Sequence, residues 1–357
     1  MKMVFLSFLH GFGGAEKQII MLANEMTNKG HDVTLISLNS NNMCYYLNPK
    51  VNYIFIPDNN LGVFKILGRY IELRKYLKKL KPDIIINFWF QTAYLTAFMS
   101  RTITGKIIYS ERGDPGDKEY SGILGFIRSI TLPRIDGFVF QSYGAMKFFD
   151  SNVQKKSIII HNPVYVDKEE CLIFNQREKT IVTIGRLHAQ KNQQLLINAF
   201  AQIADQFPSY KLEIYGDGEL RDELQNQILS LKMEERIFLL GTSKNVLNLI
   251  KNASLFVLSS DYEGLPNTLI EAMSLGIPCI STDCRPGGAR EIINDGENGI
   301  ITKCGDCDEL SSAIKFILSN PEKGLQFSKE GKKIVEKFNP IKIYEKWEKW
   351  IILVKEK

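Results

Sequence analysis

The chain opens with an apolar run, a glycine-rich break, an amphipathic helical stretch and a second apolar run. Residues 2–9 are apolar over the length of a strand, and 10–14 read His-Gly-Phe-Gly-Gly. Residues 15–29 place apolar side chains at helical spacing, and 31–38 are again strand-like. This order predicts a parallel sheet with helices on both faces. We therefore expect an α/β fold whose ligands bind at the carboxyl ends of the strands.

The alternation continues over 357 residues, a length that favours two domains. Residues 165–179 interrupt it, because they are mostly polar and lack periodicity. We place the first domain at 1–164, a linker at 165–179 and the second domain at 180–338. Further strands are expected at 83–88, 107–110, 137–142, 157–160, 180–185, 211–216, 237–240 and 254–258.

A strand, a polar turn and the start of a helix meet near residue 263. Glu263 lies in the turn, and Pro266 fits the first turn of the helix, where a missing N–H costs nothing. Gly276 stands where a helix C-cap is expected. The first turn of such a helix offers N–H groups and the positive end of a dipole to a phosphate.

Two acidic residues flank this anion site, Glu263 and Glu271. A carboxylate repels phosphate, so we expect these side chains to bind sugar hydroxyls. The pattern indicates a ligand with phosphate and polyol parts, as in a nucleotide sugar. The alternative is a helix with ordinary surface acids.

Two basic residues, Arg186 and Lys191, follow the strand at 180–185 and precede a predicted helix at 192–203. Fixed cations at the carboxyl end of a strand neutralise a diphosphate and the charge that develops when it leaves. Exposed basic residues without a ligand are the alternative.

The glycines of the first loop, Gly13 and Gly14, let backbone N–H groups approach a phosphate closely. The loop is not the dinucleotide fingerprint, because the final glycine is missing at the required offset. A tight turn is the alternative.

These motifs together resemble the retaining glycosyltransferases of family 4, which have the GT-B fold. Glu263-Gly-Leu-Pro followed by Glu271 is similar to their E-x7-E motif, and 13–16 is similar to their glycine loop. Gly-Arg-Leu-x3-Lys at 185–191 matches as well, except that Asn192 stands where glycine is common. The resemblance implies two Rossmann-like domains with parallel sheets facing a central cleft, and a C-terminal helix at 339–357 that returns toward the first domain.

The resemblance also implies roles for individual residues. Arg186 and Lys191 hold the diphosphate, Glu271 holds ribose hydroxyls, and Glu263 orients the transferred sugar. The other implied donor-binding residues are Gly13, Gly14, Gly216, Gly241, Thr242, Gly264, Leu265, Pro266 and Asn267.

A second group of residues points to the acceptor and to a subgroup of the family. Ser-Glu-Arg-x-Asp-Pro at 110–115 and the loop at 282–291 resemble bacterial galactosyl- and N-acetylgalactosaminyltransferases of surface polysaccharide synthesis. Many relatives carry a histidine where this chain has Glu111 and Arg112, so the role of the histidine is not carried over. We expect Glu111 near the acceptor hydroxyl, as a proton acceptor or orienting group, with Glu16 and Arg112 on the same side. A salt bridge that caps the strand is the alternative for Glu111.

The stretch 65–81 is a basic helix with one acid, Glu72, and an apolar side expected to include Ile66, Leu67 and Tyr70 together with Leu73 and Leu77. Its cations favour contact with an anionic membrane; the alternative is a solvated face of a docked helix. The net charge of +5 calls for no nucleic-acid partner.

No apolar run approaches the ~20 residues of a membrane span, and the N-terminus is too short for a signal-peptide core. We expect a cytoplasmic protein, peripheral on the inner face of the membrane. The close pair Cys304 and Cys307 is unaccompanied by a second pair, so no metal or cofactor is expected.

The sequence thus predicts a retaining, metal-independent hexosyltransferase. It would move a hexose or N-acetylhexosamine, galactose-type favoured, from a UDP-sugar to a glycan or lipid-linked glycan of lipopolysaccharide or capsule. A GT-B nucleotide-sugar epimerase, a glycan phosphorylase and a non-catalytic nucleotide-sugar-binding protein are the alternatives. The phosphorylase is disfavoured because nothing resembles a cofactor-lysine site.

Overall fold

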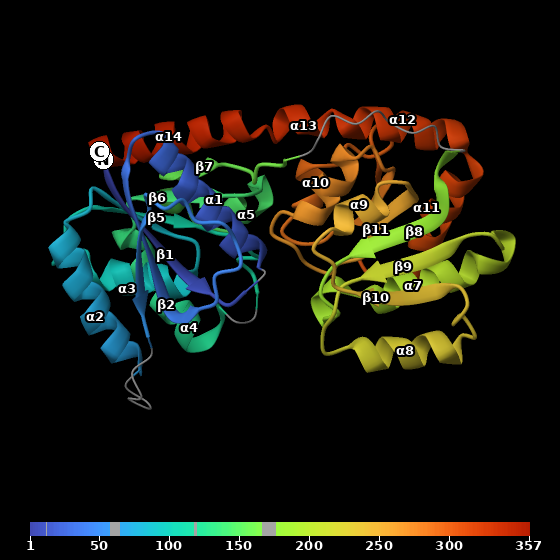
Figure 1. The fold of residues 1–357 in the computed structure, drawn as a ribbon, viewed down its shortest axis with the longest axis horizontal. Coiled ribbons are helices and arrows are strands. Elements are labelled where there is room, and N and C mark those ends of the chain that lie inside the picture. The colour runs from blue at the N-terminus through green and yellow to red at the C-terminus, as the bar shows by residue number, and fades with distance from the viewer. Residues whose placement is uncertain (12, 58–64, 118–119, 166–175) are drawn as a thin grey trace. The chain divides into compact units, whose positions relative to one another are not determined.

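The computed structural model describes residues 1–11, 13–57, 65–117, 120–165 and 176–357 (Figure 1). The described residues form two compact units, Met1–Asn162 with Ile341–Lys357, and Pro163–Pro340. Each unit is a parallel sheet with helices on its faces. Most of the predicted linker, 166–175, lies outside the described residues.

The first unit is built on a parallel sheet of order β3-β2-β1-β4-β5-β6-β7 among its described residues. Each predicted strand begins and ends within three residues of an observed one. The strands are β1 Lys2–Leu9, β2 Asp32–Asn41, β3 Asn52–Ile56, β4 Ile84–Asn87, β5 Lys106–Ser110, β6 Gly137–Phe140 and β7 Ser157–Ile159.

Alternating side chains of β1 divide the core of this unit between the two faces of the sheet. Met3 and Phe5 pack with α1 and α14, whereas Val4 and Leu6 pack with α2 and α3. The helices of the unit are α1 Gly14–Asn28, α2 Lys65–Leu80, α3 Phe90–Met99, α4 Gly122–Thr131, α5 Tyr143–Lys147, α6 Ser151–Lys155 and α14 Pro340–Glu356.

The last helix, α14, belongs to the first unit although the second unit precedes it in the chain. Trp347 is buried and stacks on Phe88, with ring centroids 5.9 Å apart. Glu348 pairs with both Lys29 and His31 at 2.9 Å. Burying an indole and closing these ion pairs fixes the helix on the face that α1 also covers.

The second unit is built on a parallel sheet of order β10-β9-β8-β11-β12-β13 among its described residues. Its strands are β8 Glu178–Ile184, β9 Lys211–Tyr215, β10 Ile237–Gly241, β11 Ala253–Leu258, β12 Cys279–Thr282 and β13 Ile300–Thr302. Its longer helices are α7 Gln193–Ile203, α8 Arg221–Ser230, α10 Asn267–Ser274, α11 Cys307–Ser319 and α12 Pro321–Lys332.

The first strand of this unit begins earlier than predicted. Arg177, placed in the linker by its polarity, is buried and donates to the carbonyls of Lys251, Ala253 and Gly276. These bonds tie the chain to the sheet before β8, so Glu178 and Lys179 are strand residues. A guanidinium that satisfies several buried carbonyls gives no periodicity signal, which is why the sequence pattern missed it.

Helix α2 is present as predicted, but its apolar side is shorter. Leu73 and Leu77 are buried, whereas Ile66 and Leu67 are each 54% exposed. The prediction that Ile66 and Leu67 belong to the packed side was wrong, because the part of the helix that meets the sheet begins later, near Tyr70.

Candidate active site

Five loops meet at the carboxyl edge of the second sheet. They follow β8, β9, β10, β11 and β12, and parallel strands bring their carboxyl ends to one edge. Each loop except the one after β12 carries residues that the sequence predicted for donor binding, and the loop after β12 is the one predicted near the donor sugar (Figure 1).

Lys191 and Glu263 form an ion pair between the loops after β8 and β11. The hydroxyl of Ser260 donates to the same Oε1 of Glu263 at 2.8 Å. Both side chains are largely shielded from solvent, with side-chain exposures of 18% and 10%. The ion pair is therefore poorly screened, and it holds the ammonium at the edge of the sheet.

Hydrogen bonds between neighbouring residues also join the loops after β8 and β11. Asp261 N–H donates to the carbonyl of Gln190 at 2.9 Å, and Gln190 Nε2 donates to the carbonyl of Tyr262 at 2.8 Å. Asn192 Nδ2 donates to Asp261 Oδ1 at 2.8 Å. Asn192 has φ of +44°, a left-handed conformation that asparagine tolerates better than most residues. This explains how asparagine occupies the position where the resemblance led us to expect glycine.

Arg186 is an exposed cation of this edge. Its carbonyl accepts from Gln193 Nε2 at 2.8 Å, and Leu187 N–H donates to the carbonyl of Asp217 at 3.0 Å. The backbone is thereby fixed, and no ion pair involves the guanidinium among the residues that the structure describes. It is a cation that a ligand can use.

Close backbone packing explains two glycines of the edge. A Cβ on Gly216 would lie 1.9 Å from the carbonyl oxygen of Gly185, and one on Gly288 would lie 2.0 Å from that of Gly264. Gly216 N–H also donates to the carbonyl of Gly241 at 2.8 Å. These positions hold neighbouring loops in contact, a structural requirement that exists beside any contact with a ligand.

Helix α10 begins at this edge behind Leu265 and Pro266, both buried. It ends as predicted, at Gly276 with φ of +70°, whose N–H donates to the carbonyl of Met273 at 2.8 Å. Glu271 lies in the fifth position of the helix, half-buried. The N-terminus of α10 thus joins Arg186 and the Lys191–Glu263 pair at one edge of the sheet.

The residues predicted for the first unit are more enclosed. Glu16 is buried and accepts from the N–H groups of His10 and Gly11 at 2.9 and 3.0 Å. These bonds occupy the N–H groups of His10 and Gly11; the predicted phosphate contacts are at Gly13 and Gly14. Gly13 and Gly14 stand at the start of α1.

Glu111 lies in a buried cluster at the carboxyl end of β5. Its Oε2 accepts from the Tyr109 hydroxyl at 2.7 Å and lies 3.5 Å from Arg128 Nη2, and its Oε1 accepts from the N–H groups of Arg112 and Gly113. Glu111 is 3% exposed. This is the geometry of the salt-bridge alternative.

Arg112 is enclosed by aromatic and amide side chains. Its guanidinium lies 3.9 Å from the ring centroid of Phe88 and 5.7 Å from that of Trp347, and Nη1 donates to Asn162 Oδ1 at 2.6 Å. Burial lowers the pKa of Arg112 to about 9, against the neighbouring charge of Glu111. The side chain therefore contacts Phe88, which follows β4, Trp347 on α14, and Asn162.

The described part of the chain holds neither a cluster of metal ligands nor a helix that could span a membrane. No three His, Cys, Asp or Glu side chains there are grouped as metal ligands would be. The thiols of Cys304 and Cys307 are free, and Cys304 Sγ lies 3.6 Å from Asp261 Oδ1. No helix in those ranges has the length and apolarity needed to cross a bilayer.

Comparison with known proteins identifies the family. The model for glycosyl transferases group 1 matches residues 168–334, and that for glycosyltransferase family 4 matches 12–168. An uncharacterized glycosyltransferase of Methanocaldococcus jannaschii is 34% identical over an alignment of 280 positions that covers 68% of this chain and 69% of that protein. The chain belongs to glycosyltransferase family 4.

Two further similarities extend over nearly the whole glycosyltransferase chain. GalNAc-alpha-(1->4)-GalNAc-alpha-(1->3)-diNAcBac-PP-undecaprenol alpha-1,4-N-acetyl-D-galactosaminyltransferase of Campylobacter jejuni is 27% identical, over 99% of each chain. The structure of HepE from Anabaena, solved in complex with UDP, superposes with a TM-score of 0.78 over 98% of this chain and 99% of HepE, at 18% identity. The predicted GT-B fold is confirmed.

The sequence analysis identified the main charged residues of the second unit. It did not identify the residues that hold them in position. Ser260, Gln190 and Gly288 each make a contact that fixes the site, yet each is a common residue in a polar loop. A signal existed only for Gly288, since adjacent glycines in a loop after a strand indicate close packing.

Proposed function

We propose that the protein transfers a hexose or N-acetylhexosamine, with a galactose-type sugar favoured, from a UDP-sugar to a glycan or lipid-linked glycan of surface polysaccharide synthesis. One observation carries the proposal: Arg186, Lys191 and the N-terminus of α10 share one sheet edge with Glu263. Family membership supports sugar transfer, the Campylobacter relative supports a galactose-type sugar on a lipid-linked acceptor, and the HepE complex supports UDP.

The charges of this edge suit a diphosphate. Lys191 is balanced by Glu263, whereas Arg186 has no carboxylate partner in the described ranges. A diphosphate placed between them draws the ammonium toward its oxygens and releases the carboxylate of Glu263 to the sugar hydroxyls. The N–H groups at the start of α10 supply further donors of the kind that phosphates bind.

The reaction breaks the bond between the anomeric carbon and the diphosphate oxygen and forms one between that carbon and an acceptor oxygen, whose proton passes to the departing diphosphate. Charge develops on the departing UDP, and Arg186 and Lys191 stabilise it. We assign retention of the anomeric configuration and independence from metals on the resemblance to the family and on these two cations.

Contact with an anionic membrane is part of the proposal. The exposed cations Lys75, Lys78 and Lys79 on α2 are accompanied there by a single acid, Glu72. Each basic residue near an anionic surface contributes about 1 kcal/mol. Changing all three lysines to Glu should abolish co-sedimentation with anionic liposomes; retained binding would refute the role of α2.

Product analysis tests the transfer itself. UDP-sugars are screened for slow hydrolysis, and the active donor is then supplied with glycan acceptors. Free UDP with an elongated glycan of the donor's anomeric configuration supports the proposal. A new UDP-sugar without glycan elongation would indicate an epimerase, and tight UDP binding without turnover would indicate a binding protein.

A further inference from the structure

The protein donors on the carboxylate of Glu263 are all on one of its two oxygens among the residues that the structure describes. Oε1 accepts from the ammonium of Lys191 and, at 2.8 Å, from the hydroxyl of Ser260. Oε2 has no donor in the described ranges, although the side chain is only 10% exposed. Shielded carboxylates usually have donors on both oxygens, because an unsatisfied polar atom away from water costs free energy. An oxygen left without a protein donor in such a place is available to a ligand.

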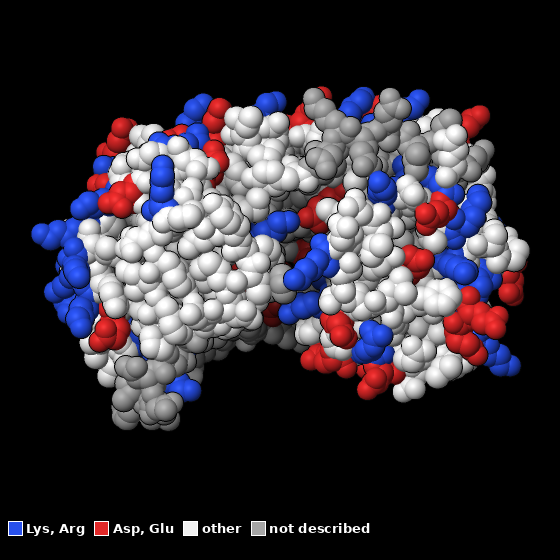
Figure 2. Space-filling view, in the orientation of Figure 1, with Lys and Arg blue, Asp and Glu red and all other residues white. Residues whose placement is uncertain are grey.

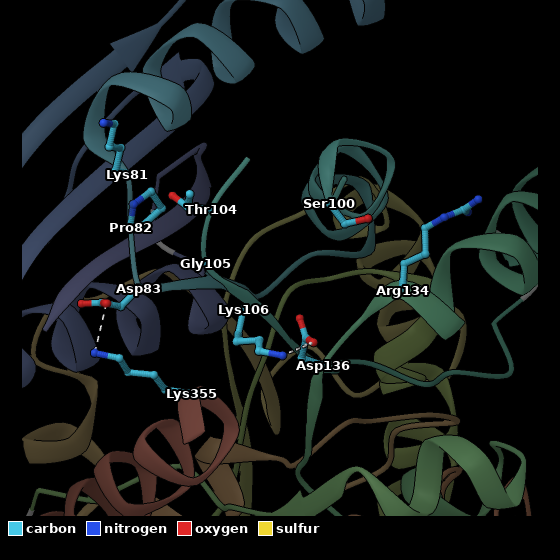
Figure 3. Close-up of a pocket in the computed structure, with 10 residues that line it drawn as sticks. All are labelled: Lys81, Pro82, Asp83, Ser100, Thr104, Gly105, Lys106, Arg134, Asp136 and Lys355. Atoms are coloured by element: carbon cyan, nitrogen blue, oxygen red, sulfur yellow. Dashed lines mark hydrogen bonds and ion pairs between the residues drawn. The ribbon is translucent and has the colours of Figure 1, made fainter. Parts of the chain in front are cut away.

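Other carboxylates of the chain are bound by the protein on both oxygens. Figure 3 shows two ion pairs in an open hollow of about 580 Å³ in the first unit. Lys106 pairs with one oxygen of Asp136, and the N–H of Ile107 donates to the other at 2.8 Å. Asp83, which pairs with Lys355, likewise accepts a backbone N–H on its second oxygen. The buried glutamates of the first unit also have donors on both oxygens.

The surroundings of the Lys191–Glu263 pair differ from those of the surface ion pairs of the same unit. Figure 2 shows acidic and basic side chains mixed over the surface of the second unit. The pair of Arg290 with Asp283 is of this kind, with side-chain exposures of 61% and 35%, against 18% and 10% for Lys191 and Glu263. Water screens the surface pairs. When the ammonium leaves Glu263, in contrast, a charged oxygen stays behind with little water to solvate it.

Ser260 is placed to satisfy that oxygen. It is fully buried, and its carbonyl accepts from the hydroxyl of Thr282, on β12, at 2.6 Å. The loop after β11 is therefore fixed at the residue whose hydroxyl donates to Glu263. The buried thiol of Cys284 stays protonated, because burial and then the charge of Glu263 raise its pKa, so it adds no second negative charge beside the carboxylate. Ser260 is a neutral donor that can remain on Oε1 whatever the position of the ammonium.

The backbone of Lys191 is fixed independently of its ammonium. The hydroxyl of Ser259 donates to the carbonyl of Lys191 at 3.0 Å, and the N–H of Lys191 donates to the carbonyl of His188 at 2.9 Å. The stem of the side chain passes over Gly185, where a Cβ would lie 3.2 Å from Cδ and Cε of the lysine. These contacts leave rotation of the side chain as the means by which the ammonium changes partners.

We propose that Ser260 is a positioning residue, which keeps Oε1 of Glu263 hydrogen-bonded when Lys191 turns to the diphosphate and so directs Oε2 to the transferred sugar. The proposal rests on the proposed function, because it assumes that a diphosphate draws Lys191 from Glu263. Before the donor binds, the ammonium and the serine hydroxyl share one oxygen. After it binds, the serine hydroxyl holds Oε1 and a sugar hydroxyl donates to Oε2.

The test is a double-mutant cycle on UDP affinity, measured by calorimetry with the full chain. Ser260→Ala should weaken UDP binding about tenfold, because the oxygen that Lys191 releases then has no donor in a shielded place. In a Glu263→Gln background the same substitution should change UDP affinity less than about twofold, because no charged oxygen is released. A serine that only packs the loop would weaken UDP binding equally in both backgrounds.

Ser254→Ala is the matched control. Ser254 lies near the amino end of β11, the strand that leads to this loop; it is fully buried, and its hydroxyl donates to the carbonyl of Glu178 at 2.6 Å. Ser254→Ala and Ser260→Ala should both lower the melting temperature, because each removes a buried hydrogen bond. Ser254→Ala should bind UDP as wild type does, so that loss of stability is separated from loss of ligand binding.

UDP affinity equal to that of wild type in Ser260→Ala would overturn the proposal, and so would an equal loss of affinity in the two backgrounds. Both results leave the proposed function standing, provided that Lys191→Ala still weakens UDP binding. A wild-type protein that does not bind UDP would overturn the proposed function and this proposal with it.

Discussion

The ammonium of Lys191 is paired with one carboxylate oxygen of Glu263, and that same oxygen accepts a hydrogen bond from Ser260. Two loops from different strands are thus joined by a charge pair with little exposure to solvent. Substituting Lys191 and substituting Glu263 should therefore have different effects on ligand binding.

Lys191→Ala should weaken UDP binding and lower turnover about 100-fold, because one cation facing a developing charge contributes about 3 kcal/mol to the transition state. Lys211→Ala, which removes an exposed lysine at the amino end of β9, is the matched control and should leave both quantities unchanged. Calorimetry with UDP and initial rates with a UDP-sugar provide the measurements. Unchanged turnover in Lys191→Ala would show that Lys191 does not stabilise the departing UDP.

Glu263→Gln should leave UDP affinity equal to that of wild type or higher, because the diphosphate no longer competes with a carboxylate for Lys191. Transfer should fall about tenfold or more, since the carboxylate is expected to orient the sugar. The same two assays decide the matter. Weaker UDP binding in Glu263→Gln would show that the carboxylate holds the nucleotide rather than the sugar.

Glu111→Gln tests whether this residue is structural. Removing one charge of a buried pair costs about 3 kcal/mol, which should lower the melting temperature by several degrees. The effect should be smaller in a background that already carries Arg128→Met, because the pair is then broken. A large fall in turnover with unchanged thermal stability would instead support the proton-accepting role.

The secondary structure could be predicted from the sequence wherever a regular pattern of apolar residues extends over many positions. The strand at 2–9 and the helix at 15–29 were found because their apolar residues repeat regularly. Among the short strands, β4, β6 and β7 were predicted, whereas β3, β12 and β13 were missed. Tertiary contacts decided that Ile66 stays exposed, which no local pattern could show.

The charged residues of the candidate site could be predicted from the sequence, but the contacts that these residues make could not. Arg186, Lys191 and Glu263 were found because strand ends in a parallel sheet converge. The enclosure of Glu16 and Glu111 was not, because their partners are backbone N–H groups and a distant arginine. Carboxylates that bind backbone look the same in sequence as carboxylates that bind a substrate.

Gly288→Ala should disturb the loop contact with Gly264 and weaken UDP binding at least tenfold. A Cβ there would lie 2.0 Å from a carbonyl oxygen, which the backbone must move to avoid. Gly287→Ala is the control: its φ of +91° makes alanine unfavourable by about 1 kcal/mol, yet its Cβ would meet open space. Equal UDP affinities in the two variants would argue against a steric role for Gly288.

The pair of Asp83 with Lys355 should make stability depend on acidic pH. The pKa of Asp83 is lowered below its ordinary value, first by the N–H of Lys2 at 2.7 Å and then by Lys355. Because the folded pKa is depressed, the stabilisation is present above pH about 4 and is lost as pH falls through the folded pKa. Asp83→Asn should melt about 2 °C below wild type at pH 7, and the difference should shrink toward pH 3. A difference that stays constant with pH would exclude the charged carboxylate as its cause.

The central claim is that the diphosphate of a nucleotide sugar binds at the carboxyl edge of the second sheet. A crystal structure of the protein soaked with UDP measures this directly. The account predicts phosphate oxygens within hydrogen-bond distance of Arg186 and Lys191, with the N-terminus of α10 facing them. Phosphates bound at another place, out of reach of both cations, would contradict it.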